Sequence, residues 1–114
     1  IDDDIRIAEL IQIWLQEAGY EVLIASDGQE GLKIQRENPV DLIITDIFMP
    51  QREGTGVLVE VYDEFPQTKV IVISGGGASD QVDYFELSRL LGAVKVFHKP
   101  FDMQELLETV QSIL

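Results

Sequence analysis

The spacing of apolar residues along the chain changes repeatedly from a helical period to short continuous runs. From Ile7 to Ala18 the apolar positions recur at helical spacing, and Gly19 follows as a stop signal. A final helix is predicted to start at Asp102, with Glu105 completing a capping box. The residues expected to face inward are Ile7, Leu10, Ile11, Trp14, Leu15 and Ala18 in the first helix, and Met103, Leu106, Leu107, Val110 and Leu114 in the last.

Three further helices and four strands are expected between these two helices. One helix follows the turn at Ser26 to Gly28 and ends near Glu37, where Asp27 and Glu30 are placed like a capping box. A second stops before Pro66, and a third, more weakly patterned, follows a glycine loop. The helices are predicted at about 27–37, 58–65 and 79–91, and the strands at 21–25, 40–45, 69–73 and 94–98.

This order of elements predicts an α/β fold with a parallel sheet covered on both faces. Leu42 to Ile44 form a continuous apolar run, which is typical of a strand buried on both sides. Strands alternating with helices of this length imply right-handed crossovers, and we count five such units in a single domain, 1–114. The chain opens at Ile1 without a methionine, so we expect the first strand to be truncated.

Composition narrows the classes of partner. The formal net charge of −13 disfavours duplex nucleic acid and anionic lipid, which require clustered Lys or Arg, and favours a cation or a basic protein face. Cysteine is absent, which excludes disulfides and thiolate metal sites. No apolar stretch approaches the roughly 20 residues needed to cross a bilayer, and no signal peptide is evident at the start. We expect a soluble, cytoplasmic domain.

Polar residues follow the predicted strands at the edge where ligands bind in open parallel sheets. Asp2 and Asp3 end the first strand, Asp46 the third, Ser74 the fourth and Lys99 the fifth. Carboxylates a few ångströms apart need a compensating cation, and Mg²⁺ prefers such oxygen ligands while leaving room for phosphate. A strand-end carboxylate such as Asp46 can also act as a nucleophile toward a phosphoramidate or an acyl phosphate. Lys99 and the metal would supply positive charge.

Each of these residues also has an ordinary structural explanation. Acidic residues before a helix favour its positive end, and a strand-end Asp commonly caps the following turn. Ser74 resembles a turn former, and His98, the single histidine of the chain, is best explained as an ordinary residue. The three glycines after Ser74 lack the spacing and the following Lys of a P-loop, so we interpret them as a flexible loop. The combination, rather than any one residue, favours a site.

The full set resembles the receiver domain of bacterial two-component response regulators. The matching motifs, which span the whole chain in family order, are Asp2-Asp3, Asp46 with Met49-Pro50 and Gly54, Ser74, and Lys99-Pro100-Phe101. The resemblance implies a flavodoxin-like, doubly wound five-stranded fold. It also implies phosphotransfer to Asp46 from a sensor histidine kinase or a phosphotransfer protein, in a domain that assists its own phosphotransfer and dephosphorylation but is not otherwise an enzyme.

The resemblance further assigns roles around Asp46. Asp2 and Asp3 would be the acidic pair that binds Mg²⁺ with Asp46, although the family usually uses only one of the pair directly, and the backbone carbonyl of Phe48 would be the third protein ligand. Ser74 and Lys99 would contact the phosphoryl group, and the peptide between Lys99 and Pro100 would be cis. The last two helices and the last strand would carry the output, as a homodimer or effector contact.

Two departures from the family pattern concern the output. Val96 stands where the family usually has a switch Tyr or Phe, and strand alternation points the neighbouring Phe97 to the other face. Aromatic switching coupled to Ser74 is therefore in question. The segment between Ser74 and Lys99 is also slightly longer than usual, which would reshape the output face.

Three rival functions stay open at this point. A phosphatase of the haloacid dehalogenase type also forms an aspartyl phosphate, but it needs a second acid where this chain has Phe48. A flavodoxin-like nucleotide or flavin carrier would offer amides and hydroxyls in its first loop, whereas the aspartates at positions 2 to 4 would repel phosphate. A receiver-like domain that no longer takes phosphate, and only binds proteins, is kept in play by Val96.

Overall fold

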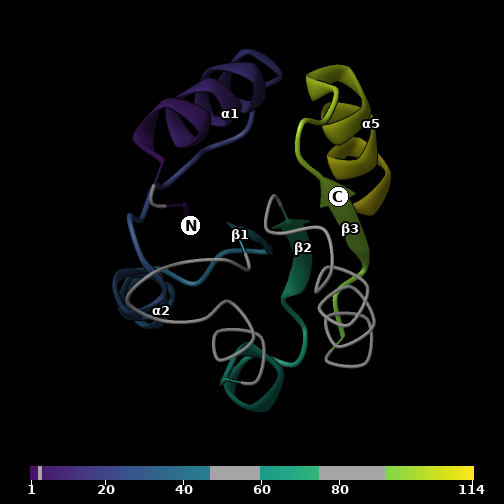
Figure 1. Cartoon of the computed structure of the whole chain (residues 1–114). Coiled ribbons are helices and arrows are strands. Elements are labelled where there is room, and N and C mark those ends of the chain that lie inside the picture. The colour runs from purple at the N-terminus through teal and green to yellow at the C-terminus, as the bar shows by residue number, and fades with distance from the viewer. Residues whose placement is uncertain (3, 47–59, 75–91) are drawn as a thin grey trace, which may run out of the picture.

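Three parallel strands form the sheet in the computed structural model, which describes residues 1–2, 4–46, 60–74 and 92–114 (Figure 1). Within these ranges β2 (Lys69–Ser74) lies between β1 (Leu42–Asp46) and β3 (Lys95–His98). The register pairs Asp46 with Ile73 and Ser74 with His98. The carboxyl ends of all three strands therefore meet at one edge.

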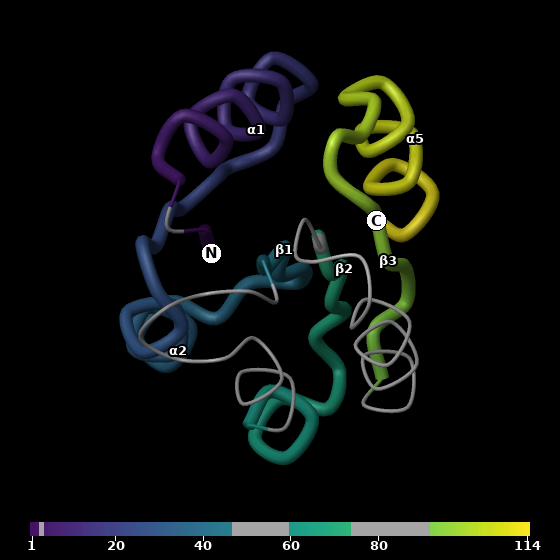
Figure 2. The backbone as a smooth tube through the Cα atoms, viewed as in Figure 1, coloured from purple at the N-terminus to yellow at the C-terminus, as the bar shows by residue number. Residues whose placement is uncertain are grey.

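Helices cover both faces of this sheet, as Figures 1 and 2 show. On one side lie α1 (Ile5–Glu17) and α5 (Met103–Ile113), and on the other lie α2 (Gly28–Glu37) and the helical residues 60–64. Alternation along β2 builds both cores, because successive strand residues point to opposite faces. The core on the α2 side contains Leu32, Ile43, Val61, Val70 and Val72, and the core on the α1–α5 side contains Ile11, Leu15, Ile71, Ile73, Phe97, Leu106 and Val110.

Each of the three helices that lie wholly within the described ranges has an aspartate as its N-cap: Asp4, Asp27 and Asp102. The side chain of Asp27 accepts a hydrogen bond from Glu30 N at 2.8 Å, and the carboxylate of Glu30 accepts one from Ser26 N at 3.0 Å. This arrangement is a variant of the predicted capping box. Asp102 caps α5 through Gln104 N at 2.8 Å. After α1, Gly19 takes a φ of 98°, a conformation that a residue with a Cβ rarely adopts. The predicted starts and stops of these helices are thus confirmed within two residues.

The expected inward faces of α1 and α5 were too wide. Leu10 and Leu114 are 46% and 54% exposed, and Ala18 is also exposed. Only a narrow stripe of α1 faces the sheet, so Leu10, one position before buried Ile11, turns away from it. Ala18 and Leu114 are the C-caps of their helices, beyond the last packed turn.

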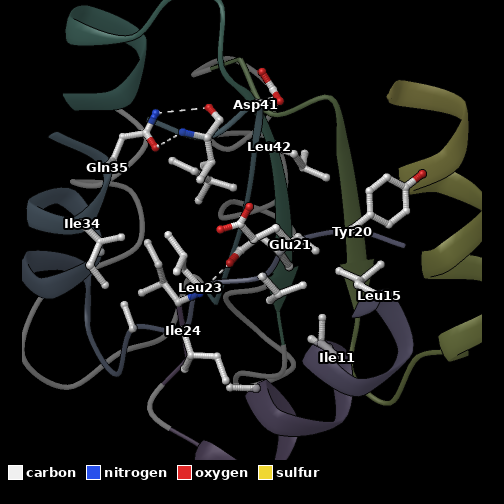
Figure 3. Close-up of a pocket in the computed structure, with 18 of the residues that line it drawn as sticks. Ile11, Leu15, Tyr20, Glu21, Leu23, Ile24, Ile34, Gln35, Asp41 and Leu42 are labelled. Atoms are coloured by element: carbon white, nitrogen blue, oxygen red, sulfur yellow. Dashed lines mark hydrogen bonds between the residues drawn. The ribbon is translucent and has the colours of Figure 1, made fainter. Parts of the chain in front are cut away.

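The strand predicted at 21–25 does not form, and this corrects the sequence analysis. The chain places only Ile1 and Asp2 between this segment and β1, where Asp2 N donates to Ala25 O at 3.1 Å. Next to Ile1, a cavity of about 600 Å³ lies between the segment 21–25 and β1. Leu23, Ile24 and Leu42 are among the residues that line it (Figure 3). A strand requires a paired neighbour, and among the described residues none lies beside this segment beyond Ile1 and Asp2. The helix predicted at 79–91 lies outside the described residues.

A buried amide that the sequence analysis did not single out ties α2 to the start of β1. Gln35 is 1% exposed. Its Oε1 accepts from Val40 N at 2.9 Å, and its Nε2 donates to Val40 O at 3.4 Å (Figure 3). The same Nε2 also donates to Thr68 Oγ1 at 3.1 Å. The side chain thereby satisfies backbone groups in the turn between α2 and β1, where a helix end would otherwise leave them unpaired.

Replacing Gln35 by Leu is expected to lower the free energy of unfolding by about 1–3 kcal/mol, because the half-buried N–H of Val40 would lose its acceptor. Urea unfolding followed by circular dichroism measures this. Gln111→Leu on the exposed side of α5 is the control and should change stability by less than about 0.5 kcal/mol. Equal effects from the two substitutions would contradict the role given to Gln35.

Candidate functional site

Asp2 and Asp46 lie side by side because Ile1 pairs with β1 as a strand residue would. Ile1 N donates to Ile44 O at 2.7 Å, and Asp46 N donates to Ile1 O at 2.9 Å. These contacts place Asp2 at the same sheet edge as Asp46, as predicted. Both residues are buried, with 4% and 5% of their surface exposed. Two buried carboxylates at one edge require a cation or bound protons to balance them.

Lys99 supplies that cation among the described residues. Its Nζ donates to Asp46 Oδ2 at 2.8 Å and to Asp2 Oδ2 at 3.1 Å. Lys99 follows β3, so its side chain crosses the end of the central strand β2 to reach the carboxylates. The peptide between Lys99 and Pro100 is cis, as expected. Three residues from three places in the sequence therefore form one charged cluster.

The protonation of Lys99 reflects two opposing effects. Burial lowers the pKa of its ammonium, but the hydrogen bond and charge of Asp46, followed by those of Asp2, outweigh this and raise the pKa above its ordinary value. The group therefore stays charged throughout the physiological range. The cluster carries one positive and two negative charges when both carboxyls are ionised.

Asp4 fixes the orientation of Asp2, a role that the sequence analysis did not assign. Asp4 N donates to Asp2 Oδ1 at 2.9 Å, while the Asp4 side chain caps α1 through Arg6 N at 3.1 Å. The side-chain hydrogen bond from Arg6 is the main cause that lowers the pKa of the Asp4 carboxyl. An aspartate bonding to the backbone N–H two residues later is a common local turn, so the spacing of Asp2 and Asp4 was the available signal.

The donor set fits a hard divalent cation. The Oδ2 atoms of Asp2 and Asp46 flank one cationic nitrogen, and carboxylate oxygens are the protein ligands that Mg²⁺ prefers. The other two predicted ligands, Asp3 and the carbonyl of Phe48, lie outside the described residues, as do Met49, Pro50 and Gly54. Within the described part of the chain, no three acidic or histidine side chains gather as a metal site. The structure thus brings together two of the four predicted ligands.

The remaining candidates divide between edge and core. Ser74 ends β2 opposite His98, which places the backbone of Ser74 at the edge of the site. The Ser74 side chain lies outside the described part of the structure. Phe97 is 5% exposed and packs in the core against α5, whereas Val96 packs against the opposite core with Val72. The predicted separation of Val96 and Phe97 onto different faces is therefore confirmed.

Comparison with known sequences finds one family along nearly the whole chain. Residues 1–111 match the response regulator receiver domain. The chain is 35% identical over 115 residues to a probable transcriptional regulator ycf27 of Cyanophora paradoxa, covering 100% of this chain and 46% of that protein. It is 34% identical to the transcriptional regulatory protein DltR of Streptococcus agalactiae serotype III, covering 97% and 48%. The chain spans less than half the length of these curated relatives.

Solved structures of receiver domains also resemble the fold of this chain. A response regulator receiver domain protein of Clostridium thermocellum matches with a TM-score of 0.88 and 35% identity, covering 98% of this chain and 88% of that one. The response regulator TrrA of Thermotoga maritima, solved in complex with Mg²⁺-BeF, matches with a TM-score of 0.84 and 34% identity, covering 99% and 94%. These matches establish the flavodoxin-like, CheY-like receiver fold for the chain, of which the described residues form three strands.

Substituting Lys99 by Met is expected to destabilise the metal-free protein by about 1–3 kcal/mol at about pH 8, because two buried carboxylates would lose their cation. The side chain of Lys99 is 19% exposed, so the effect should fall below that of a fully buried pair. Because the pKa of Lys99 is raised, its charge stabilises the fold fully below the ordinary lysine pKa, and this contribution is lost as pH rises through the pKa of the folded state.

Urea unfolding of both proteins at about pH 8 and about pH 11 measures the difference, which should shrink at the higher pH. Lys95→Met is the control. Lys95 is exposed on β3, and its substitution by Met removes the same charge as Lys99→Met. An equal decrease in the free energy of unfolding for Lys95→Met and Lys99→Met would show that the contact of Lys99 with Asp2 and Asp46 does not stabilise the fold.

Proposed function

The chain belongs to the receiver domain family of response regulators, and from that premise we propose that Asp46 is its phosphoacceptor. The single observation that carries this is the meeting of Asp2, Asp46 and Lys99 at the carboxyl edge of the sheet. A nucleophile, a second carboxylate and a cation converge there from distant parts of the sequence. A structural turn at Asp46 alone would need neither partner.

The proposed step transfers a phosphoryl group from a phosphohistidine to Asp46. A carboxylate oxygen of Asp46 attacks phosphorus, a P–O bond forms, and the P–N bond breaks with its electron pair passing to the histidine nitrogen. The product is an aspartyl phosphate. Such transfers depend mainly on positioning and on charge neutralisation, which this buried edge is built to supply.

Three groups would assist the transfer. Asp2, Asp3, Asp46 and the carbonyl of Phe48 would hold Mg²⁺, which supplies positive charge to the carboxylates and the phosphoryl oxygens when bound. The ammonium of Lys99 would pair with the phosphoryl group, and the Ser74 hydroxyl would donate to one of its oxygens. The domain in this way assists its own phosphorylation and dephosphorylation without acting on a separate substrate.

The phosphorylated domain would act as a switch within a two-component system. Phosphorylation would shift an equilibrium between two arrangements of the loops after Asp46 and Ser74. The donor would be a sensor histidine kinase or a phosphotransfer protein in the cytoplasm, and the output would pass through the last two helices and β3 to an effector or a second copy. The strong negative charge supports an output through protein contacts rather than direct binding of nucleic acid. Within the described ranges, no helix is long and apolar enough to cross a membrane.

Incubation with acetyl phosphate and Mg²⁺ is expected to add one phosphoryl group to the wild-type chain and none to Asp46→Asn. The side-chain amide of Asn cannot form an acyl phosphate. The substitution removes one buried negative charge and should leave the fold intact. Intact-mass spectrometry with and without Mg²⁺ measures the adduct.

Asp41→Asn is the matched control, since Asp41 is an exposed carboxylate just before the opposite end of β1. It should be labelled like the wild type. Labelling of Asp46→Asn at the wild-type level would refute the assignment. A folded wild-type chain that takes no label would favour a receiver that acts only by binding proteins.

A further inference from the structure

The backbone around Ile1 fixes where Asp2 enters the site. Ile1 N donates to Ile44 O at 2.7 Å, and Ile1 O accepts from Asp46 N at 2.9 Å. On the other side, Asp2 N donates to Ala25 O at 3.1 Å. The position of the Asp2 carboxylate therefore depends on how Ile1 is held between its neighbours.

The side chain of Ile1 lies against α2 at Gly31, a buried position without a Cβ. A Cβ at position 31 would overlap Cδ1 of Ile1 and would stand 2.7 Å from its Cγ1, closer than carbon atoms pack. Turning Cδ1 away would relieve only the first clash. The place of Cγ1 is set by the χ1 rotamer, which is stiff in a β-branched side chain. Added bulk at position 31 therefore requires either α2 or Ile1 to move.

Of the two, α2 is held more firmly. Leu32, the next residue of the helix, is 3% exposed and packs in the core on the α2 side. Gln35 ties the end of the helix to the turn before β1 through its hydrogen bonds with Val40. Ile1 is only half-buried, and it borders the cavity of about 600 Å³, which leaves room for it to shift. A side chain at position 31 would thus displace Ile1, and Asp2 with it.

We propose that Gly31 is a positioning residue of the site, an inference that rests on the proposed function. Gly31 has no side chain with which to reach a metal or a phosphoryl group. Its bare backbone lets Ile1 seat against α2, and the backbone of Ile1 in turn places Asp2 beside Asp46. Displacing Ile1 would change the spacing of the two carboxylates, on which both metal binding and phosphotransfer depend.

Gly31→Ala tests this role, and Ile1→Ala is its matched partner, because Ala at position 1 lacks both atoms that the new Cβ would meet. Isothermal titration calorimetry of the 114-residue chain with MgCl₂ measures metal affinity, and labelling by acetyl phosphate followed by intact mass measures the rate. Gly31→Ala is expected to bind Mg²⁺ about tenfold more weakly. It should also be labelled about tenfold more slowly at saturating Mg²⁺. Ile1→Ala and the double variant should stay within about threefold of the wild type in both measurements.

Stability does not serve as the readout, since Ala favours a helix over Gly and this gain opposes the steric cost. A purely structural role for Gly31 would leave the Mg²⁺ affinity of the folded protein unchanged. Wild-type affinity and labelling in folded Gly31→Ala would therefore overturn the proposal. A loss that the double variant fails to restore would also overturn it, because the clash with Ile1 would then not be the cause.

A measurement on the metal-free protein separates this role from the proposed function. The amide groups of Asp4 and Asp46 donate to Asp2 Oδ1 and to Ile1 O, so their NMR signals report the positions of these two acceptors. Both signals are expected to move between the wild type and Gly31→Ala, and to differ little between Ile1→Ala and the double variant. A wild type that takes neither Mg²⁺ nor a phosphoryl group would refute the proposed function, while these signals would still decide whether Gly31 positions Asp2. Signals that do not move in Gly31→Ala would overturn the positioning role.

Discussion

The contact of one ammonium with two buried carboxylates is the constraint on which this structure depends. Asp2 and Asp46 are almost fully enclosed, and two negative charges at such a position are tolerated only beside a cation. Lys99 meets that need from the far side of the central strand. The fold must therefore bring three distant parts of the sequence to within hydrogen-bonding distance, and the parallel sheet does so because all its strands end at the same edge. A site built in this way is both charged and enclosed.

The two cores explain why the edge can carry this charge. Val70 and Val72 pack toward α2 while Ile71 and Ile73 pack toward α1 and α5, so the central strand is apolar on both faces until it ends. The charged side chains of Asp46 and Lys99 lie where the backbone leaves the sheet. Val96 and Phe97 continue the same alternation on β3. At Val96, where related domains usually place an aromatic ring, this strand presents an aliphatic side chain to the core on the α2 side.

Much of this could be predicted from the sequence, and the failures have physical causes. Strand ends near Asp46 and Lys99 were predictable because the apolar residues stop just before them, at Ile44 and Phe97, and helix starts because Asp27 and Asp102 cap them. The exposure of Leu10 was not predictable, since helical spacing does not say how wide a stripe the sheet covers. The segment 21–25 has a strand-like composition, but among the described residues only Ile1 and Asp2 lie beside it, in line with the expected truncation of the first strand. Gln35 was overlooked because a polar residue in a helix normally faces water.

The central claim is that Asp46, and no other carboxylate of this acidic chain, accepts the phosphoryl group. Borohydride reduction of the chain after treatment with acetyl phosphate and Mg²⁺, followed by peptide mass spectrometry, locates the acyl phosphate directly, because only the phosphorylated side chain is reduced to an alcohol. The account predicts a reduced side chain at position 46 alone, and only when Mg²⁺ is present. Reduction at Asp2, at Asp41 or at scattered acidic residues would contradict it.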